Sequence, residues 1–485
     1  MSALKKLFKH TFIYGIATVL PRVLGLILTP LYIVKLAEAD YGIYISLMVY
    51  LILGNVLLSY GMETAFFRFM NKTGEKTKVG ATALTSVFFS SLLFLMISLL
   101  FKDQLAAWLD YKVEFIVYAI LILFLDALVV IPFAWFRNSE RPVKYSSIKI
   151  LNVIINLSFN LFFFLLLPEL IQGETNSFFN KISFENKVHY IFISNLIASL
   201  ITFLLLVPLY FKIGFNFNKI LWKQMIYYAF PVLIAGVAFS INEGIDKLLL
   251  RYLLPKETAD VEVGIYGACY KLGVFMTLFI TAFKLGVEPF FFSQADKKNA
   301  KSTYADITLY FSIFGALILL FVVVYIDLLK LLLIPEENYW KALWIVPVIL
   351  MANLCLGIYH NLSVWYKITD QTKFGAYISV AGAVITLILN FLLIPVISYK
   401  GAAIATLMAY GSMMLLSYYF GQKRYPVPYN LKKIGGYLGT SALFSFLSFY
   451  VFDRNIVIGS GLLLVFLILI FISEKAMLKS ILLKR

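Results

Sequence analysis

Long apolar segments alternate with short polar segments along the entire chain. Each apolar segment has about 20 residues, which is the length that an α-helix needs to cross the hydrocarbon core of a bilayer. The pattern predicts an all-α, polytopic membrane protein with about 14 transmembrane helices. The predicted helices cover residues 11–34, 43–67, 79–101, 113–136, 146–168, 189–211, 225–250, 263–286, 303–326, 341–365, 374–396, 399–420, 434–452 and 455–473.

Two of these segments share a pattern that indicates an internal repeat. A Gly-Ile-Tyr tripeptide begins at Gly42 and is followed by a Gly-Met-Glu tripeptide that ends at Glu63. A second Gly-Ile-Tyr begins at Gly264 and is followed by Gly-Val-Glu, which ends at Glu288. Internal repeats are typical of secondary transporters. Because each half has an even number of helices and starts on the same side, we predict parallel repeats with Glu63 and Glu288 at equivalent positions.

Composition and charge support the membrane interpretation. Hydrophobic residues make up 61% of the chain, whereas soluble domains contain roughly 45–50%. The excess of Lys and Arg, 42 against 26 Asp and Glu, would suggest nucleic acid in a soluble protein. Here these residues concentrate in every second loop, as the positive-inside rule describes. The sequence thus predicts a multi-pass membrane protein with both termini in the cytoplasm and no nucleic-acid partner.

The sequence lacks the features that would indicate an enzyme. Membrane glycosyltransferases and O-antigen polymerases, the alternative from another functional class, usually carry large outer loops, and no polar segment here is long enough. The sequence has no Walker A motif, so no nucleotide hydrolysis is expected. Cys269 and Cys355 both lie in apolar segments, and the three histidines show no metal-ligand spacing. We therefore predict that the protein is not an enzyme and uses neither a cofactor nor a metal.

A few charged residues lie inside the predicted helices. Arg22 is predicted near the middle of the bilayer, Lys271 about a third of the way in from the outer side, and Asp126 near mid-depth. Glu243 and Asp246 lie toward the outer end of their helix. Charges at such depth cost several kcal/mol, so they usually face protein or water.

A second charged group lies near the end of the predicted helix 225–250. Glu243, Lys247 and Arg251 recur every fourth residue and therefore share one helix face. This face is either a rim that gathers anionic headgroups or, as we favour here, a solvated helix end. The nearby Asn242 is a candidate for contact with sugar hydroxyls.

Two segments carry a resemblance to a known family. Residues 21–47, PRVLGLILTPLYIVKLAEADYGIYISL, resemble the first helix pair of bacterial oligosaccharide and O-antigen flippases. These are polysaccharide biosynthesis proteins of the multidrug/oligosaccharidyl-lipid/polysaccharide exporter (MOP) superfamily. Residues 387–411, LILNFLLIPVISYKGAAIATLMAYG, resemble their eleventh and twelfth helices, with Asn390, Pro395 and Gly401-Ala402-Ala403 in the expected order.

The resemblance implies an architecture and an activity. It implies an N-terminal lobe of six helices (1–224), a second six-helix lobe (225–422), and two additional helices with a cytoplasmic tail (423–485). The lobes would enclose a cavity and rock between inward- and outward-facing states. The implied function is a flippase that moves undecaprenyl-diphosphate-linked oligosaccharide across the cytoplasmic membrane for surface polysaccharide. Its partners would be this polyprenyl-diphosphate-linked glycan, membrane lipids, a polysaccharide polymerase and glycosyltransferases.

Under this interpretation the charges inside the helices acquire roles. The substrate-binding candidates in the cavity are Arg22, Lys271, Arg251 and Asn242, because a diphosphate needs compensating positive charge. The alternative is that Arg22 and Lys271 form structural ion pairs with Asp126, Glu63 or Glu288. The candidates for gating or ion coupling are Glu63, Glu288, Asp126, Glu243 and Asp246, and for the two repeat glutamates we favour a gate that ties the lobes together.

Two other transporters of the same fold stay open from the sequence. A lipid II flippase is one, since Arg22 also matches an arginine near the first helix of those proteins. A cation-coupled multidrug exporter is the other, but it would favour acidic residues in the cavity, whereas the deepest charge here is basic.

Overall fold

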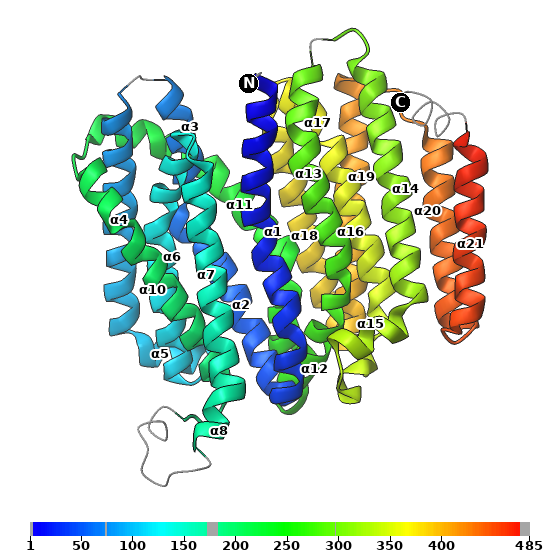
Figure 1. Ribbon diagram of the computed structural model, residues 1–485, viewed down its shortest axis with the longest axis horizontal. Coiled ribbons are helices and arrows are strands. Elements are labelled where there is room, and N and C mark those ends of the chain that lie inside the picture. The colour runs from blue at the N-terminus through cyan, green and yellow to red at the C-terminus, as the bar shows by residue number, and fades with distance from the viewer. Residues whose placement is uncertain (1–2, 73–74, 172–182, 296, 476–485) are drawn as a thin grey trace. The chain divides into compact units, whose positions relative to one another are not determined.

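The computed structural model describes residues 3–72, 75–171, 183–295 and 297–475, and in these residues it contains helices but no strands (Figure 1). Thirteen helical stretches of the described chain are long and apolar enough to cross a membrane. The first helix, α1 (Ala3–Lys35), is a further apolar helix of 33 residues. The prediction of an all-α polytopic protein with about 14 spans is confirmed.

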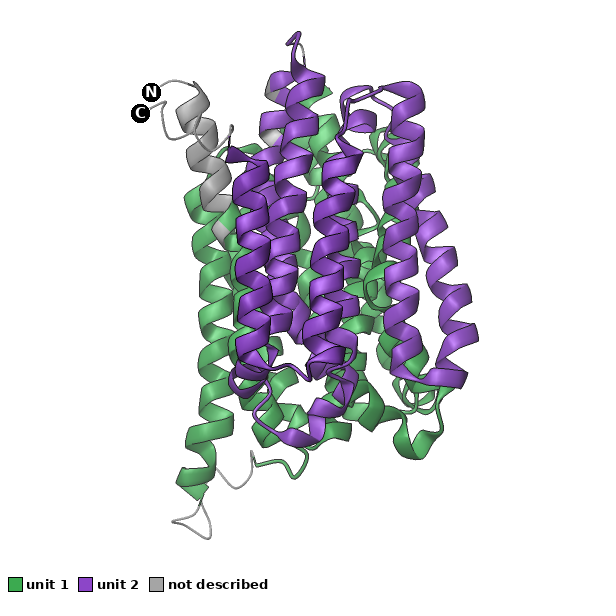
Figure 2. Ribbon diagram, turned by 90° about the vertical axis from the view of Figure 1, so that its right-hand side faces the viewer, with its two compact units in different colours: residues 1–264 green, residues 265–485 purple. Residues whose placement is uncertain are grey.

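The chain divides into two compact units, residues 1–264 and residues 265–485 (Figure 2). The first unit holds α1, α2 (Glu38–Ser59), α3 (Met62–Lys72), α4 (Lys76–Leu100), α5 (Lys102–Leu109), α6 (Val113–Asn138), α7 (Pro142–Leu161), η1 (Phe162–Leu166), α8 (Leu167–Ile171), α10 (Val188–Ile213), α11 (Lys219–Leu253) and the first half of α12 (Lys256–Tyr270). The boundary comes after α11 because α11 packs against α2, α3 and α4. The lobes 1–224, 225–422 and 423–485 stay a prediction.

The second unit contains the remaining helices. They are η2 (Lys271–Gly273), α13 (Val274–Gln294), α14 (Ala300–Val324), α15 (Ile326–Leu333), η3 (Glu337–Ala342), α16 (Ile345–Leu362), α17 (Val364–Ile368), α18 (Lys373–Ile397), α19 (Tyr399–Arg424), α20 (Leu431–Phe446), η4 (Leu447–Val451) and α21 (Ile456–Ser473). Helix α19 packs closely against both α16 and α18, and α20 and α21 pack on α14.

Small residues explain why α18 and α19 approach so closely. A Cβ on Gly401 would lie 2.7 Å from the backbone carbon of Leu393, so a larger residue would push the helices apart. Ala402 and Ala403 next to it are fully buried. The small residues that carry the family resemblance are therefore packing residues of this helix pair.

Two predicted helices are interrupted, which the hydrophobic pattern did not indicate. The segment 43–67 breaks between α2 and α3, where Tyr60 and Gly61 have φ angles of 34° and 72°. A Cβ on Gly61 would lie 2.6 Å from the carbonyl oxygen of Ala229, so the left-handed turn there also needs glycine for space. The segment 263–286 breaks instead at η2, which contains Lys271. Apolar content alone does not report such breaks, because the residues on both sides remain apolar.

Candidate functional site

The two Gly-Ile-Tyr motifs of the repeat meet where α2 crosses α12. A Cβ on Gly42 would lie 1.8 Å from the carbonyl oxygen of Asp260 and 3.0 Å from the nitrogen of Gly264. A Cβ on Gly264 would lie 2.0 Å from the carbonyl oxygen of Glu38 and 3.1 Å from the nitrogen of Gly42. Each glycine thus contacts the carbonyl four residues before the other, as a local two-fold relation between the helices requires. The crossing has no room for any side chain at either position.

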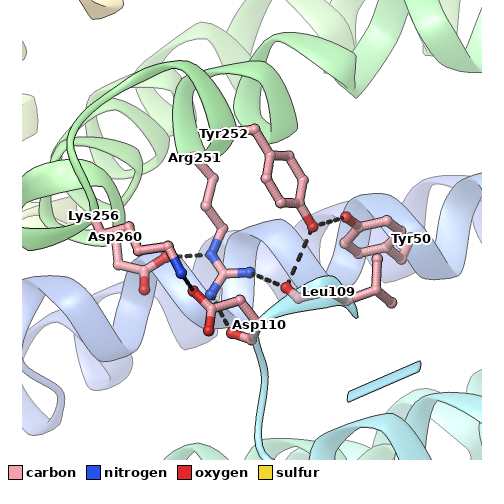
Figure 3. Close-up of polar contacts among 7 residues, drawn as sticks. All are labelled: Tyr50, Leu109, Asp110, Arg251, Tyr252, Lys256 and Asp260. Carbon is pink, nitrogen blue, oxygen red and sulfur yellow. Dashed lines mark hydrogen bonds and ion pairs between the residues drawn. The ribbon is translucent and has the colours of Figure 1, made fainter. Parts of the chain in front are cut away.

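Arg251 lies near the end of α11, just before α12, which Figure 1 shows at the end of the first unit opposite to the start of α1. Its Nε donates a hydrogen bond of 2.6 Å to Asp260, one helix further along the chain. Its two terminal nitrogens donate to the backbone carbonyls of Leu109 and Asp110 at 2.9 and 2.8 Å (Figure 3). The guanidinium also lies 3.6 Å from the ring centre of Tyr111. With 8% of its side chain exposed, Arg251 is held almost entirely by protein.

Three further polar contacts surround this arginine (Figure 3). Lys256 Nζ pairs with the carboxylate of Asp110 at 2.8 Å. The hydroxyl of Tyr252 donates to the carbonyl of Leu109 at 3.3 Å and lies 2.6 Å from the hydroxyl of Tyr50. We call Asp110, Arg251, Lys256 and Asp260 the far-end cluster. It ties α11 and α12 to the turn between α5 and α6, with α2 alongside.

Acid weakens the Lys256–Asp110 pair only at low pH. The hydrogen bond from Lys256 holds the pKa of Asp110 below its usual value of about 4. A carboxyl with a depressed pKa stabilises the fold above its unfolded pKa and loses that effect as the pH falls through the folded value. The window therefore lies below about pH 4. Both partners are exposed to solvent, so their pair contributes little compared with the buried Arg251.

The polar residues of α11 that precede Arg251 differ in their exposure. Asn242, Asp246 and Lys247 are buried, and Lys247 Nζ lies 2.9 Å from the Asp246 carboxylate. Glu243 is exposed. Our interpretation of this shared face as a solvated helix end is therefore wrong for Lys247 and Arg251. Both side chains are enclosed, because α11 packs on α2.

The remaining candidates lie on separate elements. Arg22 is exposed and lies in α1, about 20 Å along the helix from its end at Lys35. Asp126, on α6, accepts a hydrogen bond of 2.8 Å from Ser199 and a longer one of 3.4 Å from Asn55. Lys271 begins the helix break at η2. The substrate-binding and coupling roles of these residues stay predictions.

The repeat glutamates each pair with a basic residue of their own unit. Glu63 lies 2.8 Å from Arg137, at the end of α6. Glu288 pairs with Lys367, on α17 just after α16. Each pair joins the second long helix of its repeat to the fourth, so the repeat extends to these partners. Each pair lies within one unit, and the gate that we favoured for the two glutamates stays a prediction. The sequence analysis counted Arg137 and Lys367 only among the loop charges.

Comparisons with known proteins identify the family. A family model described as "Polysaccharide biosynthesis protein" matches residues 7–283. The chain belongs to this family. No curated protein matches the sequence closely enough to add a relative.

Solved structures show the fold of this polysaccharide biosynthesis protein. A lipid II flippase, MurJ, in an inward closed conformation matches with a TM-score of 0.73 at 15% identity, over 96% of this chain and 100% of that one. An inward-facing multidrug resistance MATE transporter of the MOP superfamily matches with a TM-score of 0.63 at 12% identity, over 88% and 96%. A MOP superfamily transporter from Pyrococcus furiosus gives 0.55 at 12% identity, over 87% and 95%. The family and fold are those of membrane transporters.

We expect Arg251→Lys to weaken the far-end cluster of this family member by about 2–3 kcal/mol, because one ammonium cannot reach all three acceptors and hydrogen bonds to charged groups are worth about 1.5–3 kcal/mol each. Lys256→Gln, which removes only an exposed pair, should have little effect. The thermal unfolding midpoint of the purified protein in detergent measures both changes. Equal midpoints for the wild type and Arg251→Lys would show that the cluster does not hold these helices together.

Proposed function

We propose that this protein moves a polyprenyl-diphosphate-linked oligosaccharide across the cytoplasmic membrane by alternating access, for the synthesis of a surface polysaccharide. The family match and the fold of flippases and exporters support a transporter in polysaccharide biosynthesis. In the proposed orientation both termini are cytoplasmic and the far-end cluster lies on the outer side.

The observation that carries the choice of substrate is Arg22. It is exposed about 20 Å from the end of a 33-residue apolar helix, where a cation facing lipid would cost several kcal/mol. A diphosphate that crosses the bilayer needs such a charge, and guanidinium can bind two phosphate oxygens at once. We therefore propose that Arg22 faces the transport pathway and binds the diphosphate.

In this proposal Arg251 holds helices together and does not bind the diphosphate. Its donors are occupied by Asp260 and by the backbone carbonyls of Leu109 and Asp110. Together with the Gly42–Gly264 crossing, it ties the first helices of the second repeat to the first repeat at the far end. We propose that these contacts separate when the substrate leaves on the outer side.

Deletion of the gene, followed by complementation, tests the proposed function in the cell. The wild-type protein should restore surface polysaccharide, and the deletion strain should accumulate the lipid-linked precursor on the cytoplasmic side. The same cells should expel cationic dyes at the same rate with and without the protein. Normal surface polysaccharide in the deletion strain, or dye efflux that depends on the protein, would favour the multidrug exporter and contradict the proposal.

A further inference from the structure

A narrow cleft in the second unit surrounds the Glu288–Lys367 pair. Its space for the centres of water-sized molecules is about 20 Å³, room for about one water, so a larger group enters only when the side chains around the pair move apart. Its walls come from α13, α14, α16 and α17, so it lies entirely within residues 265–485. We call it the α13 pocket; the lining residues that matter here are Lys284, Glu288, Phe291, Phe292, His360 and Lys367.

The α13 pocket combines positive charge with aromatic walls. Lys367 pairs with Glu288, and 26% and 38% of these two side chains remain exposed, so a ligand can reach the pair. Lys284 lies one helical turn before Glu288 and is exposed. The residues that line the pocket include two ammonium groups and one carboxylate, so the lining itself carries more positive than negative charge. Most of the remaining wall is apolar, so the pocket suits an anion attached to a hydrocarbon chain.

The first repeat has no lysine at the position equivalent to Lys284. Aligning Gly61-Met62-Glu63 with Gly286-Val287-Glu288 places Ser59 where the second repeat has Lys284. The first repeat therefore has the ion pair, Glu63 with Arg137, but not the additional cation.

The second repeat also has more open space than the first repeat around the glycine that precedes its glutamate. A Cβ on Gly61 would lie 2.6 Å from the carbonyl oxygen of Ala229, so the first repeat is tightly packed there. A Cβ on Gly286 would meet no atom within 4 Å. The second repeat has thus gained both a charge and open space at the same position, which a merely structural ion pair does not require.

We propose that the α13 pocket binds the phosphate group of a lipid. Lys284 and Lys367 hold the phosphate as charge-assisted donors, and Phe291 and Phe292 contact the first carbons of the chain. The phosphate displaces Glu288 from Lys367, since both are anions that compete for the same ammonium. Membrane phospholipids and a polyprenyl-diphosphate-linked glycan share this chemistry, so the site does not depend on the proposed function.

Binding of short-chain lipids to the purified full-length protein, measured by native mass spectrometry, tests this site. The probes are dioctanoyl phosphatidic acid and farnesyl diphosphate, and dioctanoylglycerol is the control that has the chains of the first probe without its phosphate. We expect both anionic probes to bind at least about tenfold more tightly than dioctanoylglycerol, since they alone make charge-assisted contacts. A tenfold preference for farnesyl diphosphate would identify the lipid-linked substrate as the source, and equal affinities would identify membrane phospholipid. Binding of the neutral control as tight as that of the anionic probes, or no binding of either anion, overturns the proposal.

Matched variants separate binding from structure. Lys284→Ser, which installs the residue of the first repeat, should weaken binding of the anionic probes about tenfold, and Lys284→Arg should retain it. Glu288→Gln should strengthen binding, because it removes the competing carboxylate, while a structural role for Glu288 predicts weaker binding. Glu63→Gln and Arg137→Gln in the first repeat should leave the affinity unchanged. Because Lys284 is exposed, Lys284→Ser should fold normally, and an affinity within twofold of the wild type for this folded variant would contradict the proposal.

Discussion

Replacing Gly42 or Gly264 by alanine is expected to separate α2 from α12 at the far end. The added Cβ would lie 1.8 or 2.0 Å from a backbone carbonyl oxygen, whereas real Cβ atoms essentially never approach closer than 3.0 Å. Because backbone atoms cannot move aside as a flexible side chain does, we expect each variant to lose about 1–3 kcal/mol of stability. The thermal unfolding midpoint in detergent measures this loss.

The double variant makes the test specific to the crossing. Once the first alanine has moved the helices apart, the second should cost little, so the two losses should be clearly less than additive. Gly411→Ala in α19 is the matched control, since a Cβ there would meet no atom within 4 Å and alanine favours a helix. Additive losses, or midpoints unchanged from the wild type, would show that the two glycines do not contact each other.

Substitution of Arg22 is expected to have the largest effect on transport. Arg22→Ala removes the charge that we propose for the diphosphate, and hydrogen bonds to charged groups are worth about 1.5–3 kcal/mol, so transport should fall about 10- to 100-fold. Arg22→Lys should restore part of the activity, because an ammonium keeps the charge but lacks the planar fork. Surface glycan relative to the amount of protein in the membrane measures both variants.

A structural role for Arg22 makes a different prediction. Normal glycan export by Arg22→Ala at normal protein levels would refute the phosphate-binding role. If Arg22→Ala fails to accumulate, the double change with Asp126→Asn decides between the two roles, since recovery of the protein level would identify an ion pair. We expect no recovery, because Asp126 accepts hydrogen bonds from Ser199 and Asn55.

The sequence predicts the fold well because membrane helices are governed by length and apolar content. Most described helices of membrane-spanning length begin and end within about five residues of the predicted segments, since backbone groups in a bilayer must be satisfied within the helix. The larger differences are at α1, which begins at Ala3 and not at residue 11, and at the stretch Lys256–Phe292, predicted as 263–286. The helix breaks at Gly61 and Lys271 were missed for the same reason: what sets them is space near another helix and local backbone geometry, which hydropathy does not report. The short helices α5 and α15, each of eight residues, are similarly below the length that the pattern detects.

The candidate site was predicted only in part. Arg251 could be found from its position in a helix, but its acceptor Asp110 lies 141 residues away, and only the folded chain brings them together. The repeat motif indicated that Gly42 and Gly264 are equivalent, not that they touch. In contrast, the difference between Ser59 and Lys284 is visible in the aligned motifs, and it acquires meaning only with the open space around Gly286.

Transport by the purified protein in liposomes tests the central claim most directly. The liposomes contain a polyprenyl-diphosphate-linked oligosaccharide with a fluorophore on the sugar, and dithionite added outside quenches only the outer leaflet. With wild-type protein we predict quenching of nearly all fluorescence, against about half in empty liposomes, since the two leaflets hold similar amounts of lipid. Arg22→Ala should quench like empty liposomes over the same time, and labelled phosphatidylcholine should not be moved. Quenching that stays at the level of empty liposomes with folded wild-type protein would contradict the claim that this chain is a flippase for lipid-linked oligosaccharide.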